Sequence, residues 1–98
     1  MTTDPGHERR IRVTVTGRVQ GVWYRAWTAE EARDLGLDGW VRNRSDGSVE
    51  AILAGSRKDI DAMLCLLEEG PPLAAVETVA WEPFTEEVAR GFAQRPTF

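Results

Sequence analysis

The chain is poor in the residues that most often carry hydrolytic chemistry. Its 98 residues include one histidine, one cysteine and one lysine. His7 precedes the first expected strand, so a phosphohistidine intermediate or a histidine general acid has little support. Cys65 lies between two leucines of an expected helix with no arginine-rich loop around it, so we interpret it as a small packed residue rather than a nucleophile.

Other absences limit the possible binding partners and the cellular compartment of the protein. No apolar run approaches the roughly 20 residues of a membrane-spanning helix, and the first ten residues have no signal-peptide core. We therefore expect a cytoplasmic protein without a membrane partner, which a lone cysteine also fits. The carboxylates are not grouped with histidine at ligand spacing, so we expect no metal and no cofactor. A net charge of −4 argues against a nucleic-acid partner, because such domains are usually basic.

The hydrophobic content of 42% and the charged content of 29% are ordinary for one globular domain. Residues 1–9 are polar and aperiodic, so we expect a flexible tail followed by a domain over 10–98. Nothing in the pattern indicates an oligomer, and we expect a monomer.

Hydrophobic periodicity predicts the order strand, helix, strand, strand, helix, strand, with a short last strand. The expected strands cover 10–16, 39–43, 49–53, 76–81 and 92–95. One helix carries Tyr24, Thr28, Ala32 and Leu35, and the other begins after Ser56 and carries Ile60, Met63, Leu64 and Leu67. This order is the ferredoxin-like split βαβ pattern of the α+β class. We expect an antiparallel sheet with both helices on one face, while Pro96 leaves the pairing of the last strand open.

A loop with two glycines joins the first expected strand to the first helix. A helix N-terminus carries unpaired N–H groups and partial positive charge, so such a loop can wrap an anion. An arginine at the helix start can add a charged clamp. The candidate phosphate-binding residues are Gly17, Arg18, Val19, Gln20, Gly21, Val22 and Arg25. No Lys-Ser/Thr follows the second glycine, so this is not a nucleotide P-loop, and the alternative is that the glycines merely turn the chain.

A second segment reads Gly39-Trp40-Val41-Arg42-Asn43, then Gly47-Ser48-Val49, with Gly55 closing it. The two segments resemble, in order and spacing, the two signatures of the acylphosphatases. Residues 70–76 are also similar to the segment that follows the second helix in that family, so the resemblance covers about residues 10–95. Arg18, Arg25, Arg42 and Arg44 lie in or beside the two segments, which indicates positive charge concentrated at one place.

The resemblance implies hydrolysis of small acyl phosphates, with inorganic phosphate or sulfate as a further site ligand. It assigns phosphate binding to Arg25, orientation of the attacking water to Asn43, and the role of base to the substrate phosphate. The chemistry tolerates the missing nucleophile, metal and histidine, because the carboxylate leaving group needs no proton donor. Positioning and charge stabilisation then suffice. Without the resemblance, Asn43 would be interpreted as a hairpin residue.

Two rival functions remain at this stage. One is a non-catalytic ferredoxin-like module that binds RNA or protein, since one fold hosts many functions. RNA-binding sheets of this type expose aromatic residues on a basic surface, whereas the first strand here carries Ile, Val and Thr. The other is an acylphosphatase-like accessory domain of a larger carbamoyl-transfer enzyme, for which 98 residues leave no room. Trp23 and Trp40 are expected to pack in the core or at the rim of the loop.

Overall fold

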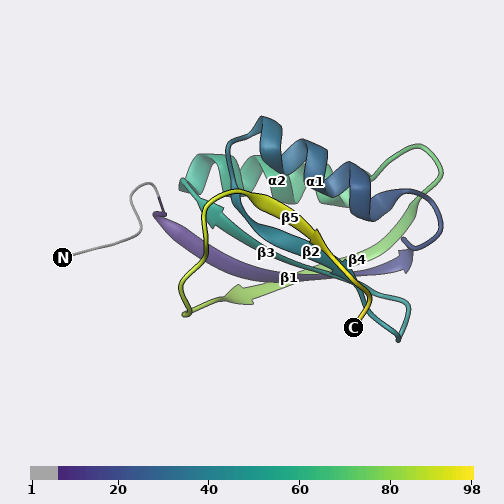
Figure 1. Ribbon diagram of the computed structural model, residues 1–98. Helices are drawn as coiled ribbons and strands as arrows, with labels where there is room; N and C mark the ends of the chain where they lie inside the picture. The colour runs from purple at the N-terminus through teal and green to yellow at the C-terminus, as the bar shows by residue number, and fades with distance from the viewer. Residues whose placement is uncertain (1–6) are drawn as a thin grey trace.

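The computed structural model describes residues 7–98 and contains the elements in the expected order (Figure 1). The elements are β1 (Arg9–Arg18), α1 (Tyr24–Asp34), β2 (Asp38–Asn43), β3 (Val49–Gly55), α2 (Arg57–Glu69), β4 (Ala75–Pro83) and β5 (Phe92–Arg95). Neither helix in this part of the chain is long and apolar enough to cross a membrane.

The strands form one sheet in the order β4-β1-β3-β2-β5, and both helices cover the same face (Figure 1). This confirms the expected ferredoxin-like α+β fold. The core lies between the two layers, where alternate residues of the strands meet the apolar stripes of the helices. Its largest members include Ile11, Val13, Val15, Tyr24, Val41, Leu53, Ile60, Met63 and Leu67.

The expectation of a wholly antiparallel sheet is wrong at one edge. β1 runs antiparallel to β3 and β4, and β2 runs antiparallel to β3, whereas β5 pairs parallel to β2 from Gly39 opposite Phe92 to Arg42 opposite Arg95. The geometry follows from the topology. β1 and β2 share one direction because both oppose β3, and β4 runs against them. A single reversal in the connection over 84–91 therefore returns β5 in the direction of β2.

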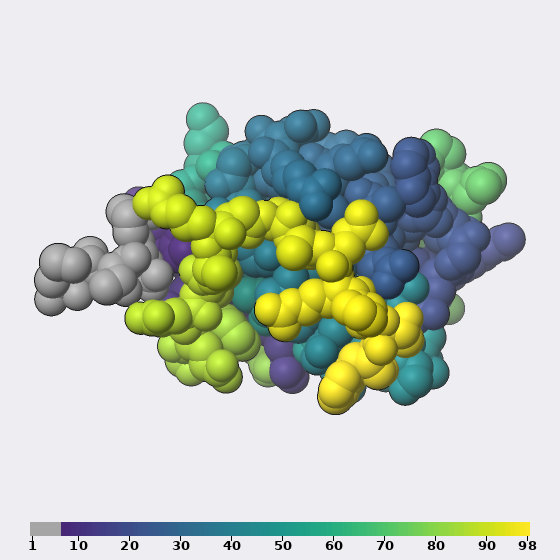
Figure 2. Space-filling view, viewed as in Figure 1, coloured from purple at the N-terminus to yellow at the C-terminus, as the bar shows by residue number. Residues whose placement is uncertain are grey.

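Pro96 does not end the pairing of the C-terminal segment. The N–H of Phe98 donates to the carbonyl of Asn43 at 3.0 Å, and the N–H of Ser45 donates to the carbonyl of Phe98 at 2.9 Å. The contact with β2 and its turn thus resumes two residues after the proline. Figure 2 shows this segment, in yellow, on the outside of the molecule beside the teal residues of the central strands.

The second helix is built as its sequence predicts, except at Cys65. The Ser56 Oγ accepts a hydrogen bond from the Asp59 N–H at 3.1 Å, which caps the helix. Met63 and Leu67 are buried, but Cys65 is exposed. A residue two positions from the buried stripe is rotated about 200° around the helix, so the interpretation of Cys65 as a packed residue is wrong.

Part of the expected tail belongs to the folded domain. Residues 1–6 of that tail lie outside the described residues, but Arg9 begins β1, and the Nε2 of His7 donates to Asp38 Oδ2 at 2.7 Å. The other Asp38 oxygen accepts from the Gly91 N–H at 2.7 Å. Burial raises the pKa of Asp38, but the hydrogen bonds from His7 and Gly91 outweigh it and the pKa is lowered overall.

The face of the sheet away from the helices carries a buried carboxylate among arginines. The Glu50 side chain is 2% exposed and accepts from Arg42 Nε at 2.7 Å, with Arg44 at 3.4 Å and Arg12 at 3.5 Å. Three guanidinium groups compensate the burial of this one charge. Two of the arginines expected to concentrate charge at the glycine-bearing segments, Arg42 and Arg44, are therefore engaged on this face.

Aromatic rings on this face are also engaged by arginines. The guanidinium groups of Arg42 and Arg95 lie 4.7 and 4.5 Å from the ring centroid of Trp40, and Arg42 lies 4.1 Å from that of Phe98. These are cation–π distances. An RNA-binding sheet needs ring faces that are free to stack on bases, so this arrangement does not favour the RNA-binding alternative.

Gly39 provides a test of the packing between β2 and β3. Its φ is +136°, and a Cβ at this position would overlap the carbonyl oxygen of Ile52 on β3. We expect Gly39→Ala to lower the free energy of unfolding by more than about 3 kcal/mol, because strain and a backbone clash act together. Urea denaturation measures the change.

Gly36→Ala is the matched control, since Gly36 also has a positive φ but a Cβ there would meet nothing within 4 Å. Backbone strain alone should cost about 1–2 kcal/mol. Equal losses in the two variants would show that the close approach to Ile52 does not constrain this strand.

Candidate active site

A depression of about 310 Å³ lies where β1 passes into α1. Arg25, from the first turn of α1, and Asn43, the last residue of β2, both line it. The remaining lining residues are Val19, Gln20, Gly21, Trp23, Tyr24, Ala26 and Gln94. A larger hollow of about 510 Å³ between Trp40 and the connection after β4 contains neither Arg25 nor Asn43. The candidate site is therefore the smaller depression, because both Arg25 and Asn43 line it.

Unpaired main-chain donors belong to the segment that lines most of this depression. Within residues 7–98, the backbone N–H groups of residues 20–26 donate to no protein acceptor. An orphan N–H group is a strong hydrogen-bond donor, and successive ones in a loop and first helical turn converge on one region of space. The arrangement suits an anion with several oxygens.

The start of α1 differs from the start of α2 in a way that favours anion binding. Trp23 occupies the N-cap position of α1 with φ 69° and ψ 20° and makes no side-chain cap, and no acidic residue lies in the first turn. The start of α2, in contrast, has the Ser56 cap and an acidic residue, Asp59. The positive end of the α1 dipole is thus not compensated by the protein's own side chains.

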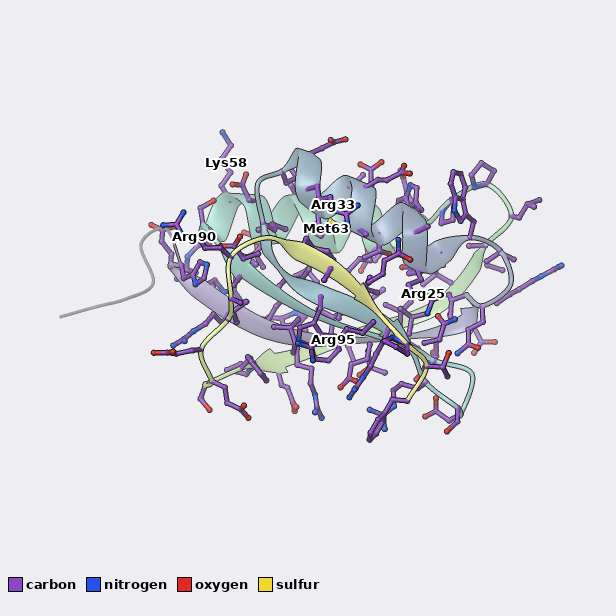
Figure 3. The ribbon with its side chains drawn as sticks, in the orientation of Figure 1. Arg25, Arg33, Lys58, Met63, Arg90 and Arg95 are labelled. Carbon is purple, nitrogen blue, oxygen red and sulfur yellow. The ribbon has the colours of Figure 1, made fainter. Side chains whose placement is uncertain are left out.

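Arg25 is held by the last strand. Its Nη1 donates to the backbone carbonyl of Arg95 at 3.0 Å, and Figure 3 shows the two labelled residues on the neighbouring elements α1 and β5. A guanidinium group has five N–H donors in a planar fork. One bond to β5 orients the group and leaves other donors for a ligand.

Asn43 contributes an unsatisfied buried acceptor. Its backbone carbonyl accepts from Phe98, but within the described part of the chain no group donates to its buried side-chain Oδ1. A buried carbonyl without a donor costs about 1–3 kcal/mol, so a native structure retains one where it has a use. The carboxamide can accept from a bound water through Oδ1 and donate through Nδ2.

Gln20 fastens the loop to the turn between β2 and β3. Its Nε2 donates to the carbonyls of Arg44 and Ser48, each at 2.8 Å. The turn itself is ordered by Asp46 Oδ1, which accepts from the hydroxyl and the N–H of Ser48. These two bonds lower the pKa of Asp46. The loop and the strand end that carries Asn43 are therefore tied together.

Three of the sequence-predicted residues do not line the depression. Gly17 lies in β1, where the register with β4 shifts, and a Cβ there would overlap the carbonyl of Ala75, so its small size serves strand packing. Arg18 is exposed at the end of β1, and the Val22 side chain is buried in the core. Of the four arginines expected to gather at one place, only Arg25 lines the depression.

Gln94 lines the depression and was not identified from the sequence. It pairs opposite Val41 in β5, on the helix side of the sheet that Asn43 shares. The alternation within the last strand contains a signal, because the buried Phe92 and the polar Gln94 must face the same side. Only the pairing of β5 with β2 shows that Gln94 lies beside Asn43 and the loop.

Tyr24 has a structural contact despite its place at the site. Its hydroxyl donates to the carbonyl of Leu67 at 2.7 Å, which connects α1 to α2. Burial raises the pKa of Tyr24 far above its usual value, so the phenol stays neutral. Within residues 7–98, His, Cys, Asp and Glu side chains form no group of three that could hold a metal ion.

The fold and the depression define a small α+β domain that can hold an anion opposite a carboxamide. The family model of the acylphosphatases matches residues 11–94. An acylphosphatase of Rhizorhabdus wittichii is 51% identical over 86 residues, which are 88% of this chain and 87% of the relative. The chain belongs to the acylphosphatase family.

Solved structures agree with this assignment. An acylphosphatase from Coxiella burnetii has 43% sequence identity and a TM-score of 0.88, with 97% of this chain and 100% of that chain covered. The full-length HypF structure in its phosphate- and nucleotide-bound form matches with a TM-score of 0.83 at 23% identity, over 91% of this chain and 12% of that one. The second likeness shows the fold alone.

The double hydrogen bond of Gln20 generates a prediction about the loop. Gln20→Ala removes both bonds to the β2–β3 turn, so we expect a loss of about 1–3 kcal/mol in stability. We also expect faster exchange of the Arg44 and Gly47 amides, which are hydrogen-bonded within that turn. Hydrogen exchange read by NMR measures the second effect, and unchanged exchange of these two amides would contradict the fastening role of Gln20.

Proposed function

We propose that this chain hydrolyses acyl phosphates by direct attack of water on the phosphoryl group, without a metal, a cofactor or a covalent intermediate. The observation that carries the proposal is the meeting of Arg25, the unpaired N–H groups of residues 20–26 and the unsatisfied Asn43 Oδ1 at one depression. It supplies the two things that phosphoryl transfer requires, charge stabilisation and positioning.

In the proposed reaction the phosphate lies in a cradle formed by Arg25 and the backbone N–H groups of residues 20–26, and its oxygens accept hydrogen bonds from these groups. Asn43 holds a water in line with the phosphorus. The water oxygen forms a bond to phosphorus as the bond to the acyl oxygen breaks, and the acyl group leaves with the electron pair as a carboxylate. A phosphate oxygen takes the proton of the water, so no side chain needs to act as a base.

The same mechanism explains the expected substrate range. A carboxylate is a stable leaving group, whereas the alkoxide of a phosphate monoester needs a proton donor. His7 bonds to Asp38 in the N-terminal part of the domain, Cys65 is on the outer face of α2, and Tyr24 is held by Leu67. None of the three is placed to supply that proton. We further propose a monomeric, cytoplasmic enzyme, for which inorganic phosphate or sulfate is a weak site ligand.

We expect hydrolysis of an aryl acyl phosphate to survive exhaustive chelation, and phosphate monoesters to be hydrolysed poorly. The expectation rests on a mechanism that uses only protein donors and the substrate phosphate. Colorimetric release of phosphate with and without chelator is the measurement. Activity lost with chelator and restored by a divalent cation would overturn the proposed mechanism.

The roles of Arg25 and Asn43 are separable by experiment. Arg25→Gln removes a charge-assisted bond of roughly 1.5–3 kcal/mol and should weaken inorganic phosphate binding about 10- to 150-fold, together with turnover. Asn43→Ala removes the orientation of water, so turnover should fall about a hundredfold or more while phosphate still binds. Calorimetry measures the first quantity and initial rates the second.

Cys65→Ala is the control for these variants, because it changes an exposed side chain of α2 that does not line the depression. Its turnover and phosphate affinity should equal those of the parent. Near-parental turnover in Asn43→Ala would instead return this residue to a purely structural role in the β2–β3 hairpin.

A further inference from the structure

Trp23 is the one exposed aromatic residue at the site, and neither its backbone nor its side chain gains stability from its position. It is the single non-glycine residue with a positive φ among residues 7–98, and for a bulky side chain this conformation is strained. Its side chain is 67% exposed, so the indole recovers little from burial. A strained residue that leaves a large apolar surface in water points to a ligand.

The other tryptophans have partners within the protein. Trp27 contacts Tyr24, Trp40 is stacked with Arg42 and Arg95, and Trp81 lies under Arg9. Within the described part of the chain, Trp23 has no ring contact, cation contact or side-chain hydrogen bond. The indole face is therefore available to a ligand at no cost of broken contacts.

The position of Trp23 places its indole where the acyl half of a bound acyl phosphate would lie. It lines the same depression as Arg25 and Asn43 and precedes Arg25 by two residues at the start of α1. Charged and amide groups of the depression suit the phosphate and the water. The exposed indole and the half-buried methyl group of Ala26 are the apolar groups of the lining outside the core that remain for the acyl half.

We propose that Trp23 binds the acyl group and makes this enzyme favour acyl phosphates with a flat aromatic or extended apolar acyl group over acetyl phosphate. This inference rests on the proposed function, because it needs the phosphate to lie in the cradle beside Arg25. A planar ring can lie against the indole in an offset or edge-to-face arrangement, which stabilises aromatic pairs beyond the area they bury. An acetyl group is too small to cover the indole and gains little.

Trp23→Gly tests the proposal without threatening the fold, since glycine adopts the positive φ without strain. The measured quantity is the ratio of kcat/KM for benzoyl phosphate to kcat/KM for acetyl phosphate. We expect the ratio to fall about 5- to 30-fold in Trp23→Gly, the scale of one lost aromatic contact together with its buried area. Trp23→Phe keeps an aromatic face and should retain most of the parental ratio.

Leu73→Ala is the matched control, because Leu73 is 74% exposed and does not line the depression. Its ratio should equal that of the parent. A parent that hydrolyses neither substrate contradicts the proposed function itself. If the parent hydrolyses both substrates and Trp23→Gly leaves the ratio unchanged, the acyl-binding role of Trp23 is overturned and the proposed function is not. An equal loss of activity on both substrates also leaves the ratio unchanged and would assign Trp23 to phosphate binding.

Discussion

The pairing of β3 with both β1 and β2 is the constraint on which the site depends. Val49 lies opposite Val15 on β1 and opposite Asn43 on β2, so the ends of the three strands align at one end of the sheet. Because side chains alternate, a slip of one residue between β2 and β3 would turn Asn43 to the far face. The same slip would move the buried Val41 out of the core and turn Arg42, which pairs with Glu50 on the far face, into it.

β5 supplies the remaining contacts of the depression. As it runs parallel to β2, its carboxyl end lies at the same end of the sheet as those of β1 and β2. Gln94 then lines the depression, and the carbonyl of Arg95 orients Arg25. His7 and Gly91 both bond to Asp38, at the other end of β2. The edge strand is thus anchored at its start, and at its end it positions Arg25 and Gln94, which line the depression.

Stability and function conflict at the start of α1. The helix lacks a cap, its first N–H groups have no protein acceptor, and Trp23 holds a strained φ. Each feature destabilises the free protein, whereas α2 has a side-chain cap and an acidic first turn. The anion that we propose for the loop would relieve the first two deficits, and its binding would then be thermodynamically linked to folding of this end of the domain.

The sequence alone determined the element order and the Ser56 cap of α2, because periodicity and capping are local. It also predicted an anion-binding loop, and the family resemblance of its two glycine-bearing segments predicted the pair Arg25 and Asn43. Only the tertiary structure decided the direction of β5, the exposure of Cys65, the separation of Arg42 and Arg44 from the depression, and the place of Gln94 in it. These depend on which segments distant in sequence become neighbours. Strand order and register fix that choice through packing of the whole core, which no short stretch of residues encodes.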